Sequence, residues 1–424
     1  MITSELLDSR RAASSSSRSH KKSNKTMRRK QQVERWVLPQ GAEQIIRQIA
    51  AEQILFELLG DIFSMAVVGQ ERKNAKRKAE FNTILKVVEE FPGTCQKVYP
   101  FRWEDGATRA LYPLAAICCL RPPVDVVQAM YKANPEAISA LEATRESMPL
   151  HYACGFGASL DVVRFLVTVY PSSISACRTD KVSPLHLACA YYKGGEPDVI
   201  NFLLDEFPEG ASQIATDMGW LPLHSAAHGG AHHSIIDRLC QLYPDSPTTP
   251  DSKGRTSLHI ACERRGNYEG VKCLLKNAPQ LADVEDDSRF TPLSLAAMHQ
   301  SLDVLEMLLE FTQVLEDNHG VSLLHMAAFQ NTVEVIDFLA IKYPQMLTAR
   351  VRDSDMYTPL LAACRHEAPV EVVRSLIRHD PSTLNMPDGE GRPPIESARQ
   401  AGADKAIIQV LQDELNAVAA AEFE

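Results

Sequence analysis

A proline-led apolar motif returns along most of the chain at nearly even spacing. Successive copies are 36, 35, 38, 35, 35, 31, 36 and 35 residues apart, and a fixed period of this length is typical of a solenoid built from stacked repeats. The pattern therefore predicts a repeat array and not one compact core. The copies, of which "SPLHLAC" at 183–189 is representative, begin at Pro113, Pro149, Pro184, Pro222, Ser257, Pro292, Leu323, Pro359 and Pro394.

A second apolar stripe follows each motif about ten residues later. Examples are "DVVRFLVTVYP", "DVINFLLDEFP" and "VEVVRSLIRHDP", in which apolar residues recur every three or four positions, as they do on one face of a helix. Each repeat is therefore predicted to be a helix, a short turn, a second helix and an extended connection.

The chain before the first motif has a different pattern. From about 43 to 68, apolar residues fall at mixed three- and four-residue spacings, which predicts one long or two shorter amphipathic helices. The stretch "FNTILKVVEEFPG" predicts a further helix that ends at Pro92. Residues 36–107 are either a cap with one degenerate repeat or a small separate helical unit. We prefer the cap, since the exposed end of a repeat array must be covered.

Residues 1–35 are basic, rich in serine and nearly free of apolar residues. Such a segment cannot bury enough surface to offset the entropy of ordering, so we expect it to be disordered. We also expect 416–424 to be a short tail. No early stretch combines an apolar core with a cleavage site, and charges interrupt the most hydrophobic one, so we expect neither secretion nor membrane insertion.

Charge divides the chain into a basic tail and an acidic body. Residues 1–30 hold nine Lys and Arg against two acids, whereas the whole chain has a formal net charge of −10. The tail is an import signal, an autoinhibitory arm, a nucleic-acid contact or a plain solvated segment. We favour an import signal or a plain tail, because no aromatic residue lies among these charges before Trp36 and the acidic body repels phosphate.

The residues around each motif suit the start of a helix. A Ser or Thr before the proline can cap the first turn, and proline there has no N–H to leave unpaired. A glycine several residues earlier suits a turn with positive φ. Some repeats lack these residues, and there we expect turns that are built differently. Lys181, Arg289 and Met356 occupy the glycine position, and Met148, Leu221 and Pro393 occupy the cap position.

These segments resemble the ankyrin repeat. "DSKGRTSLHIACE", "SPLHLACA", "TPLSLAAM" and "SLLHMAAF" are similar to its pattern Asp-x-x-Gly-x-Thr-Pro-Leu-His-x-Ala-Ala, and the likeness covers about 108–415. The resemblance implies an all-α solenoid of helix-turn-helix units with β-hairpin-like connecting loops and an N-terminal helical cap. It also implies protein binding on a concave face, without catalysis.

Pairs of His and Cys three residues apart are candidates for a zinc site or for a reactive thiol. Both residue types bind zinc, and His can activate a thiol. However, one pair supplies only two ligands, and equivalent pairs should lie at least one helix diameter, about 10 Å, apart. We expect each His to tie its turn and each Cys to pack as a small apolar residue. The pairs are His151/Cys154, His186/Cys189 and His259/Cys262.

Other candidate sites are weaker still. "HSAAHGGAHH" at 224–233 is the one dense histidine group, but Gly229-Gly230 should end its helix and no nearby Cys or carboxylate completes a zinc set. Phosphate-binding, dinucleotide and nucleophile-elbow motifs do not occur. The sequence thus predicts no enzyme, no cofactor and no metal. The ten cysteines are spread along a long chain, which favours free thiols in a reducing compartment.

We expect an adaptor that binds protein partners, basic ones among them. The alternative is a regulatory or nuclear factor whose basic tail mediates import, autoinhibition or nucleic-acid contact. We expect a cytoplasmic or nuclear monomer without membrane or nucleic-acid partners. Aromatic residues and Arg dominate binding hot spots, although some of these aromatics could pack between repeats instead. The predicted partner-binding residues are Tyr191, Tyr192, Trp220, Arg255, Arg264, Arg265, Phe290, His299, His319, Phe329, Tyr357, Arg365 and His366.

Overall fold

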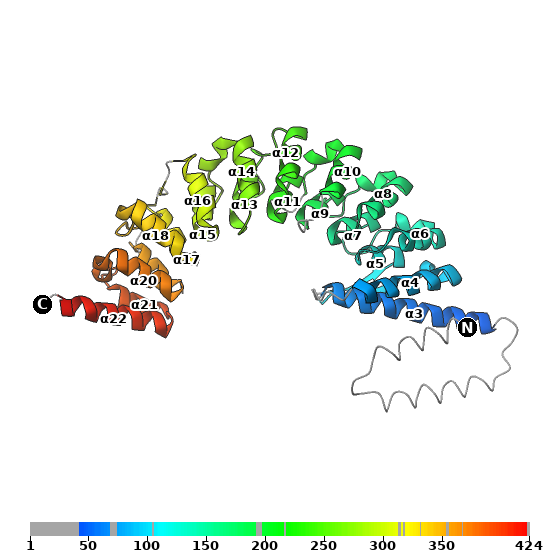
Figure 1. Cartoon of the computed structure of the whole chain (residues 1–424), viewed down its shortest axis with the longest axis horizontal. Coiled ribbons are helices and arrows are strands. Elements are labelled where there is room, and N and C mark those ends of the chain that lie inside the picture. The colour runs from blue at the N-terminus through cyan, green and yellow to red at the C-terminus, as the bar shows by residue number, and fades with distance from the viewer. Residues whose placement is uncertain are drawn as a thin grey trace, which may run out of the picture. The chain divides into compact units, whose positions relative to one another are not determined.

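A computed structural model shows a chain of short paired helices (Figure 1). It describes residues 42–67, 74–103, 106–191, 197–215, 218–312, 315–316, 319–330, 332–352, 356–366 and 368–421. The segment 1–35 and Tyr192 lie outside the described residues, so the predictions about them stay predictions. None of the helices in the described ranges is both long and apolar enough to cross a membrane.

The described residues up to 179 form the first of two compact units. The apolar stripe near 43–68 is one long helix, α3. Helix α4 packs against α6, and α3 packs against α5. Strands β1 and β2 pair as an antiparallel hairpin with Tyr99 opposite Leu111. The elements are α3 Ala42–Val67, α4 Asn74–Glu90, η1 Pro92–Gln96, β1 Tyr99–Arg102, β2 Thr108–Leu111, α5 Pro113–Cys118, α6 Val124–Ala133, η2 Pro135–Ile138, α7 Pro149–Phe156, α8 Leu160–Val169 and η3 Pro171–Ile174.

The described residues from 180 onward form the second unit. Its first helices pack on one another in chain order, and its second helices from α12 onward do the same. The last helix, α22, continues past 415 to Ala421. The elements are α9 Pro184–Ala190, α10 Asp198–Glu206, η4 Pro208–Ser212, α11 Pro222–Gly229, α12 His233–Leu242, α13 Ser257–Glu263, α14 Tyr268–Asn277, η5 Pro279–Asp283, α15 Pro292–His299, α16 Leu302–Leu309, α17 Leu323–Gln330, α18 Val333–Lys342, η6 Pro344–Met346, α19 Pro359–Arg365, α20 Val370–His379, η7 Pro381–Asn385, α21 Pro394–Ala401 and α22 Lys405–Ala421.

Small residues let neighbouring first helices approach closely. Ala226, Ala227 and Ala261 are fully buried, and so are the thiols of Cys189 and Cys262 that stand at the equivalent small position. The cysteines pack as predicted, since none of the ten forms a disulfide bond and nine are buried, with Cys177 exposed. Close packing of this kind leaves no room for a larger side chain on the shared face.

The turns before the first helices share one left-handed conformation. Gly254 and Gly391 adopt φ values of 72° and 81° there. The expectation that turns without glycine are built differently is wrong, because Lys181, Arg289 and Met356 have φ values of 55°, 66° and 41°. The contacts of the flanking helices thus impose a conformation that costs an L-residue about 1–2 kcal/mol.

The cap positions without Ser or Thr also keep the usual geometry. Met148 and Leu221 have the extended backbone of a cap, and their N–H groups donate to the imidazole Nδ1 of His151 and His224 at 3.2 and 3.0 Å. The histidine therefore holds the turn even where the capping hydroxyl is missing.

Replacing Gly254 with alanine should lower the free energy of unfolding by about 2–3 kcal/mol. The new Cβ would lie 2.6 Å from Asp287 Oδ1 and 2.9 Å from Asp287 N, in addition to the strain of the positive φ. Gly391→Ala is the matched control, since its φ is similar and no atom lies within 4 Å of its Cβ. Chemical denaturation followed by circular dichroism should show the larger loss for Gly254→Ala, and equal losses would contradict the steric argument.

Candidate functional site

In several repeats, the side chain two positions before the first helix contacts the side chain eight positions further along the chain. Because the two side chains of each pair contact each other, both lie on the same side of the first helix. We call this side of 180–424 the first-helix face, and the contacts on it the face pairs. They are Trp220 with His228 (ring centroids 5.4 Å apart), Arg255 with Glu263 (3.2 Å), Tyr357 with Arg365 (6.0 Å from guanidinium to ring) and Arg392 with Gln400.

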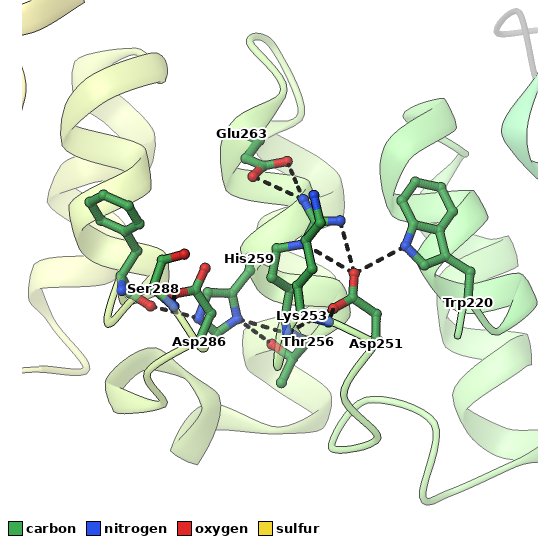
Figure 2. A network of polar contacts seen from close by, with 10 residues as sticks. Trp220, Asp251, Lys253, Thr256, His259, Glu263, Asp286 and Ser288 are labelled. Carbon is green, nitrogen blue, oxygen red and sulfur yellow. Dashed lines mark hydrogen bonds and ion pairs between the residues drawn. The ribbon is translucent and has the colours of Figure 1, made fainter. Parts of the chain in front are cut away.

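One buried carboxylate fixes two of these residues. The side chain of Asp251 has no exposed surface. Its Oδ1 accepts hydrogen bonds from the N–H groups of Lys253 and Arg255 at 2.8 and 3.0 Å. Its Oδ2 accepts from Trp220 Nε1 at 3.1 Å and from the Arg255 guanidinium at 2.8 Å (Figure 2). Trp220 and Arg255, from neighbouring repeats, are therefore held in one orientation.

The electrostatics of Asp251 follow from these contacts. Burial works against its ionisation, but the N–H of Lys253 and the side chain and N–H of Arg255 outweigh it and hold the pKa of Asp251 below its usual value. Asp388 repeats the arrangement with Arg392 and has its pKa lowered to about 2. Both carboxylates are therefore structural anions of the turns.

Histidines link each of three repeats to the next. The ring Nδ1 accepts from the N–H of its own cap residue, which places the ring proton on Nε2, and Nε2 then donates to a carbonyl of the following turn. Figure 2 shows this for His259 between Thr256 and the neighbouring repeat. The prediction that His ties the turn is confirmed. The bonds to the following turn are His186 to Trp220 O (3.0 Å), His259 to Phe290 O (3.1 Å) and His325 to Tyr357 O (3.1 Å).

The His and Cys pairs are poorly suited to nucleophilic catalysis. Burial lowers the pKa of His186 to about 4, so its ring is neutral and is used in hydrogen bonds. Burial raises the pKa values of the Cys189 and Cys262 thiols, which leaves them protonated and poorly nucleophilic. Within the described part of the chain, no three His, Cys, Asp or Glu side chains are grouped so that they could hold a metal ion.

Several residues predicted to bind partners are engaged inside the unit. Arg265 Nε donates to the carbonyl of His299 at 3.0 Å, and the Arg264 guanidinium donates to the carbonyl of His228. Arg365 donates to Ser397 Oγ and to Asp388 Oδ2, both at 3.2 Å. These arginines, with Trp220 and Arg255, stabilise neighbouring repeats, and whether they also contact a partner stays a prediction.

The other predicted residues present rings or apolar surface on the first-helix face. Tyr191 is exposed at the end of α9. The rings of Phe329 and His366, from adjacent repeats, have centroids 4.3 Å apart. Three further residues are half-buried, namely Phe290, His299 and Tyr357. His319 is exposed, and its Nε2 lies 2.8 Å from a guanidinium nitrogen of Arg289.

Some residues of the site were not predicted. Asn267 Nδ2 donates to Ala227 O at 3.1 Å, and Gln300 Nε2 donates to Cys262 O at 2.9 Å, so buried amides of one repeat cap the first helix of the repeat before it. Glu263 and His228 belong to face pairs. The spacing of eight residues from Arg255 and Trp220 was the available signal for these two, whereas nothing in the sequence pointed to the amides.

Comparison with known proteins agrees with this architecture. A family model described as ankyrin repeats (3 copies) matches residues 115–217, 190–284 and 279–349. Together these ranges cover more than half of the chain. The chain belongs to the ankyrin repeat family, which confirms the all-α repeat fold.

Individual relatives cover smaller shares of the chain. Rabankyrin-5 of Mus musculus is 28% identical over 166 residues, which are 38% of this chain and 13% of that protein. An ankyrin repeat-containing protein of Schizosaccharomyces pombe is 30% identical over 135 residues, which are 31% of this chain and 57% of that one. The ankyrin repeat domain of Bcl-3 has a TM-score of 0.40 and 22% identity, covering 55% of this chain and 99% of that domain. The chain thus matches less than two thirds of the length of Rabankyrin-5 and of the Schizosaccharomyces pombe protein.

Proposed function

We propose that the chain is a non-enzymatic adaptor that binds a protein partner on the first-helix face of 180–424. The observation that carries the proposal is the contact between the tilted rings of Phe329 and His366, which joins two repeats on that face next to the face pair of Tyr357 and Arg365. Aromatic rings held rigidly at a surface lose little conformational entropy on binding and are frequent hot spots.

Membership of the ankyrin repeat family supports the same proposal, because such repeats are generally protein-interaction modules. We further propose that the adaptor acts inside the cell. None of the ten cysteines forms a disulfide bond, and a chain with many thiols suits a reducing compartment.

A triple variant, Tyr191→Ala with Phe329→Ala and His366→Ala, should reduce partner capture at least tenfold, since truncating two or three hot spots typically costs several kcal/mol of binding. Capture from cells followed by quantitative mass spectrometry measures this for each protein that the unaltered chain enriches. The triple variant should melt within a few degrees of the unaltered chain, because Tyr191 and His366 are exposed.

The matched control removes apolar surface from second helices instead. Leu242, Tyr268 and Ile341 are exposed on α12, α14 and α18, and their combined replacement by alanine should leave capture unchanged. Undiminished capture by the first-helix variant, or an equal loss with the control, would overturn the assignment of the binding face.

A further inference from the structure

The first two turns of α3 carry an exposed apolar patch. Ile45, Ile46 and Ile49 are 62%, 43% and 57% exposed. Positions three and four apart are neighbours on a helix, so Ile49 adjoins both of the others. Isoleucine is among the residue types most often buried in folded proteins, and a group of exposed apolar side chains marks an interaction surface. We call these three side chains the isoleucine patch.

The patch continues a stripe of α3 that is covered further along the helix. Phe56 follows Ile49 by seven residues, which is two turns, and so lies on the same side. Its ring contacts Tyr99 and Phe101 of β1, with centroids 5.7 and 6.0 Å apart. Strand β1 therefore covers this side of α3 at Phe56, whereas the described residues leave the same side open at Ile45 and Ile49.

The sequence directly before α3 has the chemistry that this open side lacks. The helix begins at Ala42, and before it the sequence reads "WVL" at 36–38 and "PQG" at 39–41. Residues 36–41 lie outside the described residues. A proline favours an extended backbone at the residue before it, and proline and glycine are typical of turns. The sequence thus predicts a reversal at 39–41, after an extended apolar stretch.

The length of this stretch matches the length of the patch. Three extended residues span about 10 Å, and the seven residues from Ala42 to Ile49 rise by about the same distance along the helix. A short connection of three residues also gives 36–38 an effective concentration in the millimolar range. At micromolar concentrations of the protein, this segment therefore competes successfully with a second copy of the chain for the same surface.

We propose that Trp36, Val37 and Leu38 pack on the isoleucine patch of the same chain, in extended conformation, as β1 packs on α3 at Phe56. The basic segment 1–35 would then leave the first unit at a fixed place beside the start of α3. A competitor for the patch would release 36–38 and lengthen the tether of the basic segment. The proposal does not depend on the proposed adaptor function, so either can fail alone.

The fluorescence of Trp36 tests the proposal in the full chain. The chain contains three tryptophans, and the emission of Trp36 is the difference between the spectra of the unaltered chain and of Trp36→Phe. It should lie at shorter wavelength than that of N-acetyltryptophanamide, and acrylamide should quench it about twofold less, because one face of the ring is covered. Both differences should disappear in a chain with Ile45→Gln and Ile49→Gln, in which glutamine preserves the helix.

Leu242→Gln with Ile341→Gln is the matched control, since it replaces two exposed apolar residues on helices of the second unit. It should leave the emission of Trp36 unchanged. Emission like that of N-acetyltryptophanamide in the unaltered chain would overturn the proposal, and so would a short-wavelength emission that survives Ile45→Gln with Ile49→Gln. If quenching rises on dilution while light scattering shows a dimer dissociating, a second copy covers the patch and the proposal is wrong.

Discussion

Gly229→Ala is expected to lower the free energy of unfolding by about 3 kcal/mol, the upper part of the range for overpacking. A Cβ at Gly229 would lie 2.1 Å from the carbonyl oxygen of Cys189 and 3.0 Å from that of Ala190. Helix α11 must then move away from α9, which opens the buried contact between two repeats. The loss would appear even though alanine favours a helix by about 1 kcal/mol over glycine.

Urea denaturation followed by far-UV circular dichroism measures this effect. Gly60→Ala in α3 is the matched control, since it is the same change in a helix with no atom within 4 Å of the new Cβ. It should raise the free energy of unfolding by about 0.5–1 kcal/mol. Opposite signs for the two variants support the argument, and a neutral Gly229→Ala would contradict it.

Acidification from pH 7 to pH 4 is expected to destabilise the second unit by several kcal/mol. Burial lowers the pKa of His186 and of His224 to about 4, whereas an unfolded histidine titrates near 6.5. The unfolded chain therefore binds more protons between these values, so stability is fully present above about pH 6.5 and is lost as the pH falls towards 4. Each imidazole contributes about 3 kcal/mol to this change as an upper bound.

Thermal melts at half-unit pH steps, at constant ionic strength, test this expectation. His186→Ser with His224→Ser imitates the chain's own Ser294. The double variant should be less stable at pH 7 but should show a shallower decline between pH 6.5 and 4. His233→Gln, at an exposed position, should leave the slope unchanged. An identical slope in the double variant would show that other groups cause the pH dependence.

The sequence predicted the repeat architecture because the motif and its second stripe encode both helices of each unit. Capping residues and the left-handed glycines also followed from local chemistry. The conformation of Lys181, Arg289 and Met356 did not, because stacked neighbours impose it against local preference. The sequence of a single repeat does not show the contacts with neighbouring repeats that impose this conformation.

The partner-binding residues were predicted less well, for a physical reason. Long polar side chains such as Arg264 and Gln300 reach carbonyls of other repeats, 36 and 38 residues away in the chain. A repeat pattern gives the position of a residue on its helix but not the neighbour towards which a flexible side chain turns.

The face pairs have a consequence for how binding specificity can change. When Arg255 is replaced alone, Glu263 loses its partner and becomes a new exposed anion, so the variant differs from the original by more than the removed side chain. An alanine scan would then assign to one position an effect that belongs to two. A preference for a different partner is therefore reached more readily when both residues of a face pair are replaced together than when one of them is replaced alone.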